Sequence, residues 1–321
     1  MGATSSKSTI ASQRRPSQKQ KKPIKDAPTA TLTARSPTPQ RIIDGRTYHA
    51  VEGSQYLLPR DDQEIDRLHE THFLTKELLG CNVMADAIKT LDFQKGGLQV
   101  LDVCCGPATW LCETSLDYPS CQFVGIDMCN IWPQVIRPAN LEFIEANVLK
   151  GLPFPDKAFD FVQLRFVSLA FKTTEWANLL TEIRRVLRDG GVLQCIDLDM
   201  QIVSDDADVK RYLQHFDALC NTRGLDPSAG AKLDMMLNDH GLNILQSEYR
   251  EIPLGWGGPL GDGFMNIFSA EVQGLAPWLK RSSNLNDEQL IAMLRRTLRG
   301  MIPSKAYMGL YAFLAQKPLD D

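Results

Sequence analysis

Two carboxylates follow short apolar runs at a spacing that suits a nucleoside ligand. Val100-Leu101-Asp102-Val103 is a predicted strand, and a turn of small residues from Cys104 to Thr109 follows it. The next predicted strand ends at Asp127. A turn of small residues lets the backbone approach a ligand closely, and a carboxylate at the end of the next strand can accept hydrogen bonds from ribose hydroxyls. The pattern predicts a binding site for an adenosine-containing cofactor.

The turn differs from the glycine fingerprint of dinucleotide-binding proteins. Cys104, Gly106 and Thr109 occupy the three positions where that fingerprint has glycine, so a pyrophosphate site is poorly supported. The passage instead resembles the first motif of class I S-adenosylmethionine-dependent methyltransferases. That resemblance implies S-adenosyl-L-methionine as the cofactor. It implies Asp102 and Gly106 as contacts for the methionine part and Asp127 as the ribose ligand. Cys104 and Met128, which adjoin these residues, are further cofactor-binding candidates. NAD binding remains an alternative.

Cys104 and Ala108 stand where the methyltransferase family has glycine. If the turn needs left-handed backbone at these positions, each residue costs about 1–2 kcal/mol relative to glycine. We expect this cost to weaken cofactor binding without abolishing it. The alternative is a domain of the same fold that has lost its ligand.

The segment after Asp127 alternates strands and helices. After a strand at Leu141-Glu142-Phe143-Ile144, the resemblance places Asn147 and Val148 beside the adenine, although an Asn there can equally fix a turn. The strand Phe159-Asp160-Phe161-Val162-Gln163 then ends near Arg165. Ligands of open α/β sheets bind at the carboxyl ends of strands, so Gln163 and Arg165 are further candidates. For Arg165 a surface ion pair is the competing interpretation.

The element pattern predicts an α/β fold with a doubly wound, mostly parallel seven-stranded sheet and an antiparallel edge strand. An amphipathic helix over 175–188 precedes the strand 192–197. Near the C-terminus, 242–251 is a predicted strand and 305–316 its antiparallel partner at the edge, with helices over 263–279 and 286–299 between them. We expect this helical insertion to form the wall on the side of the methyl acceptor.

Composition divides the 321 residues into three parts. Residues 1–46 are polar and rich in Ser, Thr, Pro and Lys, which predicts a disordered basic tail. Residues 47–95 are a predicted N-terminal helical cover, and 96–321 are the predicted methyltransferase domain with a helical insertion at about 255–300. The eight cysteines fit no zinc spacing, and no signal-peptide or membrane-spanning segment is visible. We therefore expect an intracellular protein without a bound metal.

Methyl transfer is an in-line displacement that chiefly requires the acceptor to be held in line with the methyl group. If the acceptor is a hydroxyl or an amine, a base must remove its proton. His69 and His72 share one face of a helix that begins near Asp61, and Tyr56 and His215 are further candidates. A histidine at the edge of an apolar helix face is more often structural, and the sequence does not choose among the four.

The first 25 residues carry basic side chains and no acidic ones, whereas the whole chain has a net charge of −4. The folded part is therefore acidic, which argues against nucleic-acid binding by that part and assigns any anionic partner to the tail. Gly2 with Ser6 fits the N-myristoylation pattern, so the tail could attach a cytoplasmic protein to an anionic membrane surface. Nuclear targeting by the same basic residues, or an inert tail, is the alternative.

Over residues 47–318 the chain resembles a fungal group of methyltransferases related to regulators of secondary metabolism. The resemblance rests on Leu58-Pro59-Arg60-Asp61, Gly255-Trp256-Gly257-Gly258 and the closing Gly309-Leu310-Tyr311. It implies the fold and the cofactor but not the acceptor, which is a small molecule or a protein. The alternative function is a methyltransferase-like regulatory or interaction protein whose catalysis is weakened or absent, acting through a protein partner.

Overall fold

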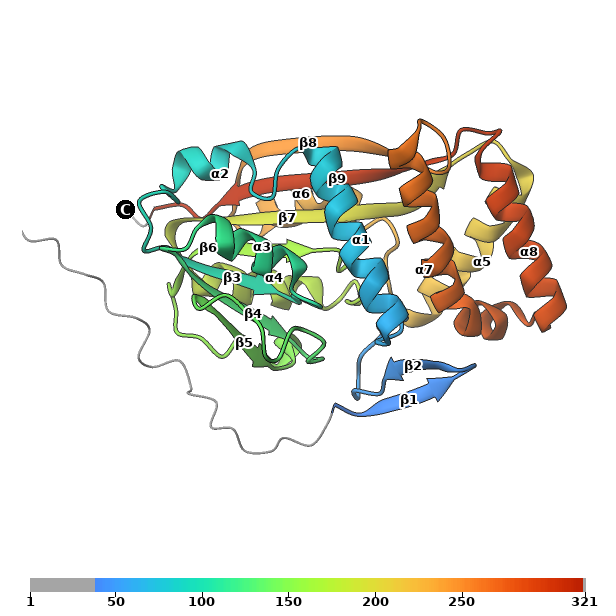
Figure 1. Cartoon of the computed structure of the whole chain (residues 1–321), viewed down its shortest axis with the longest axis horizontal. Coiled ribbons are helices and arrows are strands. Elements are labelled where there is room, and N and C mark those ends of the chain that lie inside the picture. The colour runs from blue at the N-terminus through green and yellow to red at the C-terminus, as the bar shows by residue number, and fades with distance from the viewer. Residues whose placement is uncertain (1–37, 320–321) are drawn as a thin grey trace, which may run out of the picture.

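The computed structural model describes residues 38–319. Most of the predicted basic tail, with Gly2, lies outside the described residues. Figure 1 shows one central sheet with helices on both faces, and α5, α7 and α8 gathered beyond one end of it.

The central sheet has seven strands in the order β5-β4-β3-β6-β7-β9-β8. Every pairing from β5 to β7 is parallel, and β9 runs antiparallel to both β7 and β8. The strands are β3 (Gln99–Val103), β4 (Gln122–Asp127), β5 (Leu141–Glu145), β6 (Phe159–Arg165), β7 (Leu187–Val203), β8 (Asn243–Pro253) and β9 (Tyr307–Gln316). This is the doubly wound α/β sheet that the sequence predicts.

The antiparallel strand does not lie at the edge, which corrects one detail of the prediction. β9 lies between β7 and β8, and β8 is the edge strand. The physical reason is burial: β9 is apolar on both faces, with Leu314 in one core and Phe313 in the other, whereas β8 alternates exposed and half-buried residues. Charged and polar side chains suit a sheet edge because they discourage further strand pairing.

Two hydrophobic cores cover the two faces of the sheet. The first contains side chains of α2, α3, α5, α7 and α8, and the second those of α4 and α6. Neighbouring residues of β3 divide between the cores, with Val100 in the first and Leu101 in the second, because successive side chains of a strand point to opposite faces. The helices are α1 (Asp62–Leu79), α2 (Ala85–Thr90), α3 (Thr109–Asp117), α4 (Trp176–Val186), α5 (Ala207–Arg223), α6 (Leu233–Asp239), α7 (Pro259–Ser283) and α8 (Asp287–Met301), with short 3-10 turns at Val148–Lys150 and Gly230–Lys232.

A row of polar side chains crosses the middle of the sheet on the face of the first core. Asp102, Gln163 and Gln194 are direct neighbours on β3, β6 and β7. Gln194 is completely buried, and its amide accepts a hydrogen bond from Met84 N at 2.7 Å and donates one to Asn82 O at 2.9 Å. The row thereby links the sheet to the segment that enters α2.

Residues 40–46 were expected to be disordered, but the structure places them in a hairpin. The strands β1 (Gln40–Ile43) and β2 (Arg46–His49) pair through a turn at Asp44-Gly45, whose φ angles of 49° and 80° are both positive. Such a turn favours Gly and Asp or Asn, and it was the sequence signal that the composition-based interpretation overlooked. The buried Tyr48 side chain donates a hydrogen bond to Gly274 O at 2.8 Å and so fixes the hairpin against α7 (Figure 1).

The helix α1 begins and ends with standard caps. Asp61 accepts a hydrogen bond from the backbone N–H of Glu64 at 3.2 Å, and Gly80 closes the helix with a φ of 73°. In the part of the chain from residue 38 to 319, no helix has both the length and the apolar character needed to cross a membrane. The helix α1 packs against α7 and α3.

Candidate functional site

A cavity of about 170 Å³ opens at the carboxyl ends of β3, β4 and β6. Its wall also includes residues of the hairpin and of α1, such as His49 and His72. Seven of the nine predicted cofactor-binding residues line it, although they come from four separate segments. These seven are Asp102, Cys104, Gly106, Asp127, Met128, Val148 and Arg165. We call this cavity the first cavity.

The other two candidates do not line the first cavity. Asn147 Oδ1 accepts a hydrogen bond from Leu149 N at 3.0 Å and so caps a 3-10 turn, which is the structural alternative considered for it. Gln163 is fully buried within the polar row of the sheet. Neither of its amide atoms has a hydrogen-bond partner among the described residues.

The turn after β3 adopts the backbone that glycine would favour, without glycine at two of its three critical positions. Cys104, Gly106 and Ala108 have φ angles of 60°, 53° and 61°. The side chain of Ala108 is completely buried where the turn enters α3. Cys104 and Ala108 therefore carry the strain anticipated from the sequence, about 1–2 kcal/mol each. The surrounding structure holds the loop open toward the cavity despite it.

Asp127 fastens this turn to the end of β4. Its Oδ2 accepts a hydrogen bond from Gly106 N at 3.0 Å, and its Oδ1 accepts one from Cys129 N at 2.9 Å. Burial raises the pKa of Asp127, and the backbone N–H groups of Cys129 and Gly106 oppose that shift. A carboxylate has about four lone-pair sites and the backbone donors do not use all of them, so the side chain retains acceptor capacity for a ligand. The residue can therefore hold the loop and bind a diol at the same time.

Asp102 and Arg165 are two ionisable residues on one side of the first cavity. Burial raises the pKa of Asp102 to about 8, against the lowering effect of the Arg165 guanidinium. Burial also lowers the pKa of Arg165 to about 10, opposed by Asp102 and Glu113. Within the described chain, the buried Arg165 Nε has no hydrogen-bond partner. The pair thus provides one acceptor and one donor that a zwitterionic ligand would satisfy.

His72 lies at the wall of the first cavity, but both of its ring nitrogens are engaged. Its Nδ1 lies 3.3 Å from Arg165 Nη1, which can only donate, so Nε2 carries the proton and donates to Glu113 Oε2 at 2.7 Å. Burial and the nearby Arg165 lower the pKa of His72 to about 4. The imidazole is therefore neutral near pH 7, and it orients Arg165.

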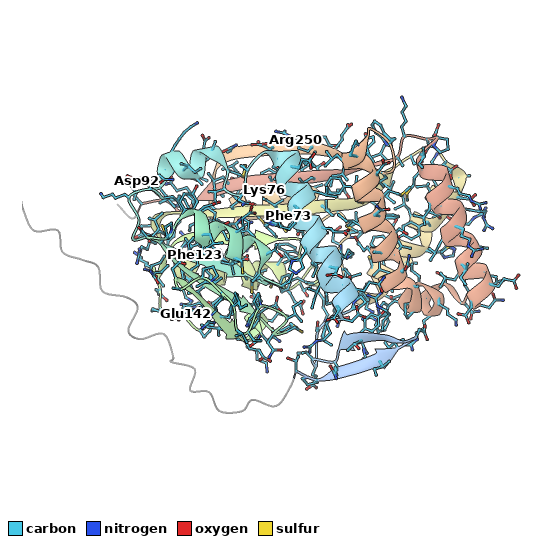
Figure 2. All side chains as sticks on the ribbon, viewed as in Figure 1. Phe73, Lys76, Asp92, Phe123, Glu142 and Arg250 are labelled. Carbon is cyan, nitrogen blue, oxygen red and sulfur yellow. The ribbon has the colours of Figure 1, made fainter. Side chains whose placement is uncertain are left out.

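Glu113 holds His72 in the position from which the imidazole contacts Arg165. It also accepts hydrogen bonds from Asn82 Nδ2 at 2.9 Å and from Lys76, the α1 residue labelled in Figure 2. Burial acts to raise the pKa of Glu113, but the hydrogen bonds from Lys76, Asn82 and His72 outweigh it and lower that pKa to about 2. A permanently ionised Glu113 fixes the tautomer of His72.

The remaining base candidates differ in position. His69 bonds through Nδ1 to Thr109 Oγ1 at 2.6 Å, and neither it nor His215 is among the residues that line the cavities described for residues 38–319. Tyr56 does line the first cavity. Burial raises the pKa of its hydroxyl, so Tyr56 stays protonated near neutral pH and can donate a hydrogen bond.

A second cavity, of about 60 Å³, adjoins the first. The two share four wall residues: Tyr56, Leu68, Thr71 and Phe166. Phe166 directly follows β6 and has a φ of 55°, which is a strained conformation for an aromatic residue. The second cavity also contains Arg67, Asp197 and Glu271, none of which the sequence singled out as a site residue. Only Asp197 gave a signal, as the acidic end of a predicted strand.

Part of the chain is similar to known proteins. Residues 100–191 match the family model described as "Methyltransferase domain". This part of the chain is therefore similar to methyltransferase domains. It spans β3 to the start of β7 and includes the turn, Asp127 and Arg165.

The chain is also similar to curated relatives over part of its length. One is the secondary metabolism regulator laeA of Coprinopsis cinerea, 29% identical over 161 residues, which are 49% of this chain and 39% of that protein. Another is the N-methyltransferase verN of Clonostachys rogersoniana, 31% identical over 146 residues, which are 44% of this chain and 50% of that protein. The chain thus spans about half or less of the length of these relatives. Among solved structures, a phosphoethanolamine N-methyltransferase 2 of Haemonchus contortus matches 81% of this chain and 60% of its own at a TM-score of 0.46 and 16% identity.

Proposed function

We propose that this protein is an S-adenosylmethionine-dependent methyltransferase. The observation that carries the proposal is the position of Asp127, which both ties down the strained turn and lines the first cavity beside Asp102 and Arg165. The match of residues 100–191 to a methyltransferase domain supports it.

The residues of the first cavity fit the cofactor from end to end. Asp127 would accept hydrogen bonds from the ribose hydroxyls, and Met128 and Val148 would contact the adenine. Asp102 would pair with the ammonium group of the methionine part. Arg165, whose Nε lacks a partner in the described chain, would donate to its carboxylate. The buried Arg165 donor, which lacks a partner in the described chain, would then be satisfied by the carboxylate of the ligand.

When bound, the cofactor supplies a methyl group that its sulfonium already activates. The protein then needs to exclude water and hold an acceptor atom in line with that methyl group. Residues shared by the two cavities, above all Tyr56 and Phe166, are in the right place for this task. Because His72 is bound at both nitrogens and has a lowered pKa, we assign it to positioning Arg165 and not to removing a proton.

Titration calorimetry with S-adenosylhomocysteine tests the proposal. We expect saturable binding by the unaltered chain and a loss of tenfold to a hundredfold in affinity for Asp127→Ala, because a charged acceptor for hydrogen bonds is removed. Glu142→Ala is a matched control, since this carboxylate lies exposed on β5 (Figure 2) and outside the cavity.

Two outcomes would contradict the proposal. No binding of S-adenosylhomocysteine at millimolar concentration by folded protein would favour the second candidate, a methyltransferase-like regulatory or interaction protein; the strain at Cys104 and Ala108 is the observation that keeps this candidate open. Tighter binding of NAD than of S-adenosylhomocysteine would point to an oxidoreductase.

A further inference from the structure

The second cavity is apolar in most of its wall and lies where an acceptor would meet the cofactor. It extends from Phe166 at the end of β6 toward α7, and side chains from α1, α7 and the long strands enclose it. Its apolar wall residues include Leu58, Met200, Ile252, Phe264, Phe268 and Met308. At about 60 Å³ it exceeds several times the space of roughly 10–15 Å³ that a single water requires. It can therefore receive a group of several apolar atoms.

Buried charge in this cavity is unbalanced. The Arg67 guanidinium donates two hydrogen bonds to Glu64, from Nε to Oε2 at 3.0 Å and from Nη2 to Oε1 at 2.7 Å. Glu271 is only 5% exposed, and its nearest cation is Arg67 Nη1 at 3.7 Å, which is too long for a hydrogen bond. One guanidinium thus faces two buried carboxylates, and Glu271 is the one left without a hydrogen bond among the described residues.

A second buried polar group on the same wall also lacks a partner. Thr75 of α1 is 2% exposed and lines the cavity, and its Oγ1 has no hydrogen-bond partner in the described part of the chain. Thr71, one turn earlier, bonds in the usual helical way to Arg67 O at 2.8 Å. Buried polar groups are costly when they are poorly paired. Glu271 has only a long ion pair with Arg67, and Thr75 Oγ1 has no partner among the described residues, so the wall of this cavity offers polar groups that a ligand could satisfy.

The other carboxylate of the cavity is already satisfied. Asp197 accepts hydrogen bonds from the backbone N–H groups of Val167, Ser168 and Leu198 at 2.8, 3.0 and 2.8 Å. It adds negative potential without needing a ligand. An acceptor bearing a carboxylate or phosphate would face both Asp197 and Glu271, which makes an anionic acceptor unfavourable.

We propose that the second cavity binds the methyl acceptor, and that this acceptor is an apolar molecule with a protonated amine that pairs with Glu271. This proposal rests on the proposed function, because it takes the first cavity as the cofactor site. It concerns recognition of the acceptor and assigns no particular atom as the one methylated. It places the specificity for charge on α7, outside the residues that match the methyltransferase domain.

Calorimetry on the full chain saturated with S-adenosylhomocysteine tests it with three probes of one shape: 2-phenylethylamine, 2-phenylethanol and phenylacetate. We expect the amine to bind at least tenfold more tightly than the alcohol, and phenylacetate not to bind. Glu271→Gln should lower the affinity for the amine tenfold or more while leaving the alcohol unchanged. Glu251→Gln, an exposed carboxylate on β8, is the matched control and should change neither.

A second variant keeps the test valid if Glu271→Gln does not fold. Phe264→Trp adds volume to the wall of the second cavity only, so it should exclude amine and alcohol alike while S-adenosylhomocysteine still binds. Equal affinity of the unaltered chain for amine and alcohol, or amine binding that survives Phe264→Trp, would overturn the acceptor proposal alone. Failure of S-adenosylhomocysteine to bind the unaltered chain would overturn the proposed function and, with it, this proposal.

Discussion

The two cavities are built by different means. The first is formed by the ends of neighbouring strands and one turn, and its charged and backbone groups lie mainly between Asp102 and Arg165. The second is assembled from side chains that range from Tyr56 to Met308, mainly on α1, α7 and the strands β7, β8 and β9. A site made by backbone geometry depends on a short stretch of sequence, whereas a site made by converging side chains depends on the whole fold. Changes in the second are therefore expected to disturb stability more than changes in the first.

The largest effect is expected at Arg67. Arg67→Ala leaves Glu64 and Glu271 buried without a cation, and removing one partner of a buried ion pair costs about 3–5 kcal/mol. Urea unfolding should register this loss, and Arg67→Ala combined with Glu64→Ala should recover part of it. The control Arg211→Ala removes an exposed pair with Asp208 and should cost less than about 1 kcal/mol. If Arg67→Ala lowered the free energy of unfolding by less than about 1 kcal/mol, changes in the second cavity would not disturb stability more than changes in the first, and the expectation would be wrong.

The next largest effect is a pH dependence of the free energy of unfolding, which arises from Asp102 in the first cavity. Burial raises the pKa of Asp102 to about 8 in the folded protein. Because this pKa exceeds that of the unfolded chain, the folded state holds an extra proton between about pH 4 and pH 8, and the free energy of unfolding falls as pH rises through that window. Relative to Asp102→Asn, the cofactor-free protein should lose on the order of a few kcal/mol between pH 5 and pH 9. Urea unfolding at pH 5, 7 and 9 measures this, and parallel curves for the two proteins would rule the effect out.

The smallest effect concerns the strained turn. Ala108→Gly relieves about 1–2 kcal/mol of left-handed strain and loses about 0.5–1 kcal/mol to the flexibility of glycine in the unfolded chain, so a net gain between about 0 and 1.5 kcal/mol is expected. Ala87→Gly is the matched control, since this buried alanine lies in the right-handed helix α2 and should lose about 1 kcal/mol. Thermal unfolding of the three proteins distinguishes these signs. A destabilised Ala108→Gly would show that the turn is not strained there.

The sequence was sufficient to predict the features that local patterns encode. The strand, turn and acidic residue around Asp102 and Asp127 were recognisable because their spacing is fixed by one strand-turn-helix unit. The inner position of β9 was not, because pairing signals do not reveal which strand lies at the edge. Likewise, no sequence motif around Glu271 or Thr75 marks them as cavity residues. They become part of the wall of the second cavity only when α7 and α1 pack in the folded protein.

The row of Asp102, Gln163 and Gln194 across β3, β6 and β7 has a consequence for assembly of the sheet. A slip of one residue in any of these strands would turn its polar side chain to the opposite face, among Leu101, Val162 and Leu193 of the second core. Misaligned pairings are therefore penalised on three adjacent strands at once. The residues that give the centre of the protein its polarity also select the correct alignment of its strands as the chain folds.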